Sequence, residues 1–168
     1  AVGKGYAVDR AVEVLADWSV GNVLVHAGTS TALGVGPGPR PGKPGWPVGA
    51  GGPWTAPGRP RDLRLRDRAL SGSGTEVKGD HIIDPRTGRP ARGHLAAWAS
   101  HPSAAVSDAL ATAFLVMTTA EVARFCRAIA KATVFGLANP EAAVKINWEV
   151  FPESKPKGVD EAKALRDA

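Results

Sequence analysis

The stretch "SAAVSDALATAFLVM", residues 103–117, predicts a helix. Its apolar residues recur at helical spacing and form one stripe when the residues are projected at about 100° each. The members of this stripe are Val106, Leu110, Ala113, Phe114 and Met117. Leu115 and Val116 extend the apolar surface around most of the remaining circumference. We therefore expect this helix to be largely buried.

Two polar residues interrupt this apolar surface. Asp108 and Thr112 are four residues apart, so their side chains share one face of the helix. A carboxylate buried without a partner is strongly destabilising, and an Arg side chain, a set of backbone amides or a cation would have to compensate for it. The alternative is that Asp108 is ordinary helix-end polarity beside Ser107.

Upstream, "GDHIIDPRTGRPARG" at residues 79–93 joins a short apolar strand directly to a crowded turn. A connecting turn needs Gly, Pro and one Asp at most, whereas this turn carries several ionisable and hydroxyl side chains. They are His81, Asp84, Arg86, Thr87 and Arg89. Their number indicates a chemical role for the turn. For His81 alone, the alternative is a histidine at a strand end that hydrogen-bonds to the turn.

The N-terminal stretch "AVGKGYAVDRAVEVLADW" predicts an amphipathic helix over residues 6–18. Gly-Lys-Gly at 3–5 lies just before this helix, where its backbone amides could face an anion at the helix N-terminus. The alternative interpretation is that these glycines belong to an ordinary loop. A turn and a short buried strand at 22–27 follow.

The rest of the chain predicts strands and loops that lead into a helical region. Gly and Pro dominate residues 34–60. Such a stretch cannot form a helix, and proline removes backbone hydrogen-bond donors from a strand. We therefore expect a long surface loop that is ordered only around residues 46–49 and Trp54. Strands are expected at 62–69, 81–83, 95–100 and 146–151, and a tight turn or phosphate-approach loop at 71–74. Thr118 and Glu121 predict a capping box that opens a helix to about residue 132.

The composition bounds the function. The 168 residues suffice for one domain with one sizeable core. The net charge of +5 permits an anionic partner, but no Lys or Arg run exceeds two residues and aromatic residues do not interleave with a basic stripe, which argues against nucleic acid. The single cysteine, Cys126, allows no internal disulfide and is expected to pack in the core.

The sequence contains no targeting signal that assigns the protein to a compartment. No stretch approaches the ~20 apolar residues that span a bilayer, and no signal peptide is visible. The chain begins at Ala1 rather than Met and opens abruptly on a motif. We therefore expect a fragment whose upstream part is missing, and the localisation stays unassigned.

Three stretches together resemble one family. "AVGKGYAVDRA", "HIIDPRTGRPA" and "VSDALATA" are similar to the three C-terminal motifs of the ApbE family, the FAD:protein FMN transferases. The middle motif is the most specific, and its spacing to the "DALAT" helix also fits. The resemblance covers roughly residues 1–135, and the N-terminal half of the family, which supplies much of the flavin and adenine pocket, is absent from this sequence.

The resemblance implies a metal site. Asp108 and Thr112 match the side-chain metal ligands of the family, and Ala1 matches the position whose backbone carbonyl is a ligand. Mg²⁺ prefers oxygen ligands in an octahedron and commonly keeps waters and substrate phosphate oxygens. One carboxylate, one hydroxyl and one carbonyl leave room for a pyrophosphate, and the cation would be the missing partner of Asp108.

The resemblance also implies the nucleotide contacts and the base. Lys4 and Ile83 match positions that contact FAD, and His81 matches a histidine regarded as a candidate catalytic base. Four departures from the family pattern count against efficient catalysis. Residues 28–30 read "GTS" where the family often has Gly-Gly-Asp, and Leu70 replaces the usual Thr before the Ser-Gly pair. The Gly- and Pro-rich tract at 34–60 replaces a more regular strand region, and the ending "INWEVF" at 146–151 does not align with the family.

The expected fold is α+β, with a mixed, largely antiparallel sheet and packed helices. Residues 1–151 would form the catalytic portion, with the loop at 34–60, and residues 152–168 a charged peripheral tail. The expected activity is Mg²⁺-dependent transfer of FMN from FAD to a Thr or Ser hydroxyl of a target flavoprotein, releasing AMP. The alternatives are FAD hydrolysis to FMN and AMP, or a truncated flavin-binding fragment without turnover.

Overall fold

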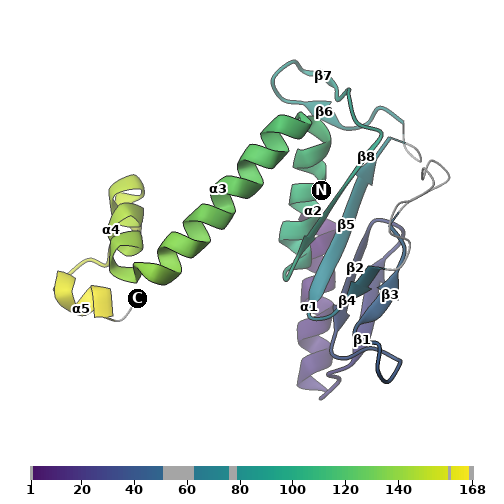
Figure 1. Ribbon diagram of the computed structural model, residues 1–168, viewed down its shortest axis with the longest axis horizontal. Coiled ribbons are helices and arrows are strands. Elements are labelled where there is room, and N and C mark those ends of the chain that lie inside the picture. Colours follow the sequence, from purple (N-terminus) through teal and green to yellow (C-terminus); the bar gives the residue numbers. More distant parts are fainter. Residues whose placement is uncertain (1, 51–62, 76–78, 159, 167–168) are drawn as a thin grey trace. The chain divides into compact units, whose positions relative to one another are not determined.

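The computed structural model describes residues 2–50, 63–75, 79–158 and 160–166 (Figure 1). The chain forms two compact units, Ala1–Thr119 and Ala120–Ala168. The predicted division into a catalytic portion, residues 1–151, and a charged peripheral tail, residues 152–168, stays a prediction.

A four-stranded sheet organises the first unit. Its strands are β1 (Val23–Ala27), β2 (Thr31–Val35), β5 (Arg68–Gly74) and β8 (Ala96–His101), and their order is β1-β2-β5-β8. All three pairings are antiparallel. The register sets Thr31 opposite Ser71, and Ser71 opposite Ala99. Three strands therefore contribute a small or hydroxyl-bearing residue at one level of the sheet.

Two short hairpins complete the strands of this unit. In the first, β3 (Trp46–Val48) pairs with β4 (Leu63–Leu65), and in the second, β6 (Ile83–Asp84) pairs with β7 (Arg89–Pro90). A Cβ on Gly34 of β2 would lie 2.7 Å from the Leu65 carbonyl oxygen. The first hairpin therefore packs directly on the backbone of β2.

Helices α1 (Val2–Asp17) and α2 (Ala104–Val116) lie side by side along one face of the sheet (Figure 1). The core beneath them contains Val8, Leu33, Ala69 and Ala104, which come from both helices and from β2 and β5. Side chains of β2 and β5 at alternate positions face this core, as the two-residue period of a strand requires.

The buried face of α2 differs from the predicted stripe. The buried residues are Ala104, Ser107, Asp108, Ala111 and Leu115, whereas Val106 is 40% exposed. The reason is the closeness of α1: a Cβ on Gly5 would lie 2.2 Å from the Ala104 carbonyl oxygen. Two helices that approach so closely need small residues between them, and the larger apolar side chains of α2 are displaced from that contact.

Several local expectations are corrected in this unit. Gly-Lys-Gly at 3–5 lies inside α1 rather than before it, and residues 71–74 belong to β5 instead of forming a turn. The strand expected at 62–69 is divided into β4 and β5 because Asp67 has a positive φ of 52°. The loop expected at 34–60 contains β3, while its residues 51–60, including Trp54, lie outside the described residues.

The second unit is helical. It contains α3 (Thr119–Ala138), α4 (Pro140–Val150), a short 3₁₀ helix (Pro152–Ser154) and α5 (Glu161–Arg166). The strand expected at 146–151 is therefore wrong: Pro140 begins a helix here, and six alternating residues are too few to separate a helical from a strand period. Cys126, expected in the core, is exposed on α3.

The predicted α+β class, with an antiparallel sheet packed against helices, is confirmed. Every strand pair in the described residues is antiparallel, so the mixed character we expected is not seen there. Within the described residues, no helix is long and apolar enough to cross a membrane.

The contact between α1 and α2 predicts the effect of one methyl group. Replacing Gly5→Ala should lower the free energy of unfolding by about 2 kcal/mol or more, because the added Cβ would overlap the Ala104 carbonyl. The matched control is Gly3→Ala in the same helix, where nothing lies within 4 Å of the added atom. The control should be neutral or stabilising by up to about 1 kcal/mol. Equal urea midpoints for the two variants would contradict the close packing.

Candidate functional site

Asp108 is the buried carboxylate of the first unit. Its residue is only 2% exposed, and its Oδ2 accepts a hydrogen bond of 3.1 Å from the Gly5 amide. Gly5 is the donor that reaches this side chain among the residues that the structure describes. An ionised carboxylate has about four acceptor positions, so most of the hydrogen-bonding capacity of Asp108 is left for other partners. The amide is one of the three compensating partners that the sequence left open.

Thr112 lies one turn further along α2. Its hydroxyl donates to the Asp108 carbonyl oxygen at 3.2 Å and is 3.0 Å from the Ser73 hydroxyl on β5. Because a hydroxyl has one proton, the Ser73 hydroxyl is the donor in the second bond when Thr112 donates in the first. Thr112 then keeps one lone pair that could bind a cation.

The donor set fits a hard divalent cation. Asp108 offers an underused carboxylate and Thr112 a hydroxyl lone pair, both from one helix face, and such oxygen atoms are what Mg²⁺ prefers. The third predicted ligand, Ala1, lies outside the described residues. Within the described residues, no group of three or more His, Cys, Asp or Glu side chains could hold a metal ion. The convergence of the three predicted ligands on one cation stays a prediction.

Lys4 lies beside Gly5 in the first turns of α1. Its side chain is exposed, and its Nζ donates a hydrogen bond to the Ser30 hydroxyl just before β2. The ammonium group is therefore held near the end of α1 from which the Gly5 amide reaches Asp108. Positive charge at a helix N-terminus favours anions there, which is compatible with a phosphate contact for Lys4.

His81 and Ile83 come from the second hairpin and the segment before it. His81 is exposed, and its Nδ1 is 3.0 Å from the Gly79 carbonyl oxygen. Ile83 is 50% exposed. The hydrogen bond to the turn is the one that we expected for a structural histidine, and it leaves Nε2 for other chemistry. The predicted shared cleft of His81, Lys4 and Asp108 stays a prediction.

Arg86 connects this hairpin to α2. Its guanidinium pairs with the Asp84 carboxylate at 2.9 Å and also donates to the Val116 carbonyl oxygen at 2.8 Å. The side-chain hydrogen bond from Arg86, followed by the Arg86 backbone amide, lowers the pKa of Asp84 below its usual value. Arg86 of the crowded turn thus contacts the C-terminal end of α2, the helix that carries Asp108 and Thr112.

Asp9 caps the other end of α2, a role that no local sequence pattern indicates. Its carboxylate accepts hydrogen bonds from the Ser103 hydroxyl at 2.8 Å and from the Ala104 and Ala105 amides at 2.7 and 2.9 Å. Burial raises the pKa of Asp9, but these hydrogen bonds together outweigh it and lower the pKa below its ordinary value. A tertiary cap of this kind leaves no local signature, because donor and acceptor are more than 90 residues apart.

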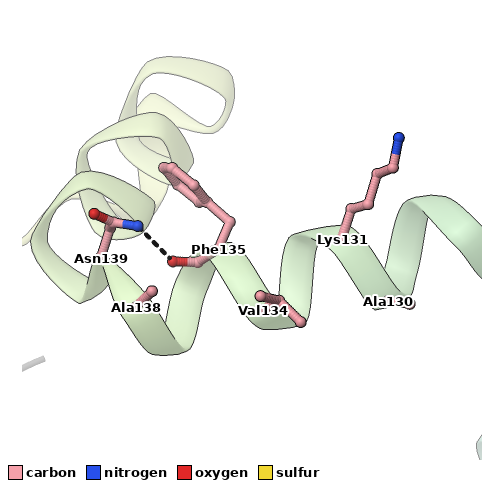
Figure 2. Close-up of a pocket in the computed structure, with 6 residues that line it drawn as sticks. All are labelled: Ala130, Lys131, Val134, Phe135, Ala138 and Asn139. Atoms are coloured by element: carbon pink, nitrogen blue, oxygen red, sulfur yellow. Dashed lines mark hydrogen bonds between the residues drawn. The ribbon is translucent and has the colours of Figure 1, made fainter.

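A hollow in the second unit has a different character. Figure 2 shows its lining residues, all from α3 and the residue that follows it, with the Asn139 side chain hydrogen-bonded to the Phe135 carbonyl. The lining consists of Ala130, Lys131, Val134, Phe135, Ala138 and Asn139. Its lining contains no predicted site residue and no acid–base pair, whereas the described candidate residues belong to the first unit.

The comparisons with known proteins identify the family. A family model described as the ApbE family matches residues 1–135, and the chain belongs to this family. A search of curated proteins gives no match.

Solved structures share the fold of the chain. The apo form of the Pseudomonas stutzeri flavinyl transferase ApbE is 26% identical with a TM-score of 0.56, and covers 68% of this chain. The Vibrio cholerae flavin transferase ApbE is 26% identical with a TM-score of 0.53, and covers 67%. A point mutant of the Vibrio cholerae protein, 23% identical with a TM-score of 0.55, covers 70% and supports the fold alone. The chain spans 36 to 38% of the length of these three proteins.

Asp9 predicts an acid-sensitive contribution to stability. Because its folded pKa lies below the ordinary value of 3.8, its stabilisation is complete above that value and is lost as the pH falls through the lower folded pKa. Asp9→Asn should therefore lower the free energy of unfolding at pH 7 by about 1 kcal/mol, as for the loss of a helix cap. The difference from wild type should shrink in more acidic solution.

Urea denaturation at neutral pH and at several acidic values would measure this difference. The control is Asp17→Asn, an exposed carboxylate at the other end of α1, which should show no comparable loss. A destabilisation by Asp9→Asn that is unchanged across the acidic range would contradict the assignment to an ionised cap.

Proposed function

We propose that this chain carries the pyrophosphate-binding part of a flavin transferase and acts in Mg²⁺-dependent transfer of FMN from FAD to a Thr or Ser hydroxyl of a target flavoprotein. The observation that carries the proposal is the buried Asp108 carboxylate, whose one donor among the described residues is the Gly5 amide. Membership of the ApbE family supplies the substrate class, since relatives of similar fold are named flavin transferases.

The proposed reaction exchanges one phosphorus–oxygen bond for another. The acceptor hydroxyl oxygen forms a bond to the FMN-side phosphorus of FAD, and the bond from that phosphorus to the bridging oxygen breaks. AMP leaves with the bonding electron pair, and the hydroxyl proton passes to a base. No oxidant or reductant is needed, so the requirements are positioning, charge compensation and proton acceptance.

The residues of this chain would divide these tasks. Asp108, Thr112 and the Ala1 carbonyl would hold Mg²⁺, which when bound supplies positive charge against the pyrophosphate. Lys4 would add a second positive charge beside the N-terminal turns of α1, where backbone amides favour an anion. Ile83, half-exposed on the hairpin, would offer apolar contact to the nucleotide.

His81 is the proposed base. The Gly79 carbonyl can only accept, so the hydrogen bond at Nδ1 places the ring proton on that nitrogen. In the neutral ring, Nε2 then carries the lone pair that can take the proton of the acceptor hydroxyl. The link from Arg86 to the Val116 carbonyl would hold this hairpin against α2 while the reaction occurs.

Asp108 is tested by removing its charge. Asp108→Asn keeps an oxygen for the Gly5 amide but loses the anionic ligand, so flavin transfer should fall by about 100-fold or more. The chain, supplemented with the N-terminal half of a full-length family member, would be incubated with FAD, Mg²⁺ and a Thr-bearing acceptor protein. In-gel flavin fluorescence and chromatography of AMP would follow the products. Asp17→Asn is the matched control.

The products also separate the alternatives. Free FMN with AMP, and no labelled acceptor, would indicate hydrolysis in place of transfer. Absence of both activities in the supplemented wild-type chain would favour a flavin-binding protein without turnover and would sink the proposal. Apolar burial of the flavin rings supplies much of the affinity for such ligands, at about 25 cal/mol per Å². The chain spans only 36 to 38% of the length of the solved flavin transferases, so without the supplement we expect weak FAD binding and poor transfer.

His81 is tested through the pH dependence of the rate. His81→Gln should lower the transfer rate by about 10² to 10⁴-fold, as for the loss of a general base. It should also flatten the fall in rate on the acid side of the profile. The matched control is His26→Gln, because His26 is likewise exposed and has its Nδ1 3.2 Å from the carbonyl of Gly28, two residues away. A wild-type profile in the His81 variant would exclude His81 as the base.

A further inference from the structure

Two hydroxyl groups in the core of the first unit have no hydrogen-bond partner. Thr31 on β2 is 3% exposed and Ser71 on β5 is fully buried, and within the described residues neither side-chain oxygen forms a hydrogen bond. Buried hydroxyls are nearly always paired, because an unmade hydrogen bond is costly away from water. The exceptions therefore need an explanation.

The two hydroxyls lie together. Thr31 is directly opposite Ser71 in the antiparallel register. The neighbouring pair along the ladder, Ser30 and Gly72, is hydrogen-bonded, because the Gly72 amide donates to the Ser30 carbonyl at 2.7 Å. Pairs alternate along an antiparallel ladder, so Thr31 and Ser71 form a non-hydrogen-bonded pair, in which the side chains approach more closely.

Both side chains face the helices. Thr31 shares its face of β2 with Leu33, and Ser71 shares its face of β5 with Ala69, and both of these neighbours belong to the core under α1 and α2. Further along the same face of β5, the Ser73 hydroxyl contacts Thr112 on α2. Ser71 thus lies between an apolar contact and a polar contact with the same helix.

Asp108 lies at the level of this pair. The Ser107 hydroxyl donates to the Ala99 carbonyl at 2.7 Å, and Ala99 is the residue opposite Ser71 on β8. Asp108 follows Ser107 in α2, and its carboxylate turns toward α1, where it meets the Gly5 amide. Because α1 covers β1 and β2 while α2 covers β5 and β8, a carboxylate between the helices lies over the β2–β5 pair.

We propose that the Thr31 and Ser71 hydroxyls form the floor of a hydrated divalent-cation site at Asp108. Each hydroxyl oxygen would accept a hydrogen bond from a water molecule bound to the cation, while Asp108 and Thr112 contact the ion. Mg²⁺ gives up its water reluctantly, so such acceptors are part of what holds it. The inference rests on the proposed function only in taking Asp108 as a cation ligand, and it adds two residues that the family resemblance does not assign.

The charge of the site decides the class of ligand. The buried charge at the hydroxyl pair is the Asp108 carboxylate, while the Lys4 ammonium lies outside it, exposed and hydrogen-bonded to the Ser30 hydroxyl. The buried part of the site therefore suits a cation, and a phosphate bound at the hydroxyl pair itself would face the Asp108 carboxylate. The competing occupant is an ordinary buried water that bridges the two hydroxyls. Removing a hydroxyl that holds such a water would lower the stability of the metal-free chain instead of raising it.

The test uses the whole chain with Ser71→Ala and Thr31→Val, and Mn²⁺ as the probe, with and without FAD. Each variant should raise the dissociation constant for Mn²⁺, followed by electron paramagnetic resonance, by about 10-fold or more. Each should also raise the urea midpoint of the metal-free chain, because the substitution removes a buried hydroxyl that lacks a partner. A higher stability together with weaker metal binding is the signature of the proposed site.

The matched control is Ser107→Ala. Ser107 is as fully buried as Ser71, but its hydroxyl is hydrogen-bonded to the Ala99 carbonyl. This variant should lower the urea midpoint and leave the Mn²⁺ affinity unchanged. The control therefore separates the loss of a made hydrogen bond from the loss of an unpaired hydroxyl.

The outcomes separate this inference from the proposed function. Unchanged Mn²⁺ affinity in both variants, with binding intact in wild type and lost in Asp108→Asn, would overturn the role of the hydroxyls and leave the cation at Asp108 in place. A lower urea midpoint in both variants with unchanged affinity would indicate a structural water instead. Wild-type chain that binds no Mn²⁺ under either condition would overturn both proposals.

Discussion

The closeness of α1 to α2 at Gly5 is the constraint on which the site depends. A Cβ there would lie 2.2 Å from the Ala104 carbonyl oxygen, so only glycine permits the contact. The same contact brings the Gly5 amide to the Asp108 carboxylate. One position therefore fixes the spacing of the two helices and supplies the described hydrogen bond that Asp108 accepts, which ties the packing of the unit to its candidate chemistry.

Two carboxylates link the same pair of helices, and their surroundings give them different roles. Asp9 of α1 accepts three hydrogen bonds at the start of α2 and is satisfied as a cap. Asp108 of α2 accepts one hydrogen bond from a described residue of α1, although it is more deeply buried. A buried carboxylate with so few donors is destabilising unless something else compensates its charge. That contrast is the reason we propose a structural role for Asp9 and a ligand role for Asp108.

The sequence predicted the existence of α2 and the presence of polar groups on it, but not which face is buried. Apolar periodicity pointed to the stripe that contains Val106, whereas the buried face consists of Ala, Ser, Asp and Leu. What decides the face is a glycine about 100 residues away, and no local pattern carries that information. The same holds for the Asp9 cap and for the Thr31–Ser71 pair, which exists only through strand register. The helix in place of the strand expected at 146–151 is a local error, since a window of six residues does not resolve the period.

Helix α2 carries or contacts several parts of the candidate site. Asp9 fixes its first turn, Asp108 and Thr112 project from its middle, and Arg86 of the second hairpin reaches the Val116 carbonyl at its last turn. A helix of this length is stiff, with a rise of about 1.5 Å per residue, so groups attached along it keep fixed separations. Departures from the family pattern at residues 28–30 and 34–60 leave these attachments to α2 in place. The helix face with Asp108 and Thr112 and the hairpin linked to α2 through Arg86 can thus keep a fixed spacing even where the surrounding loops have diverged.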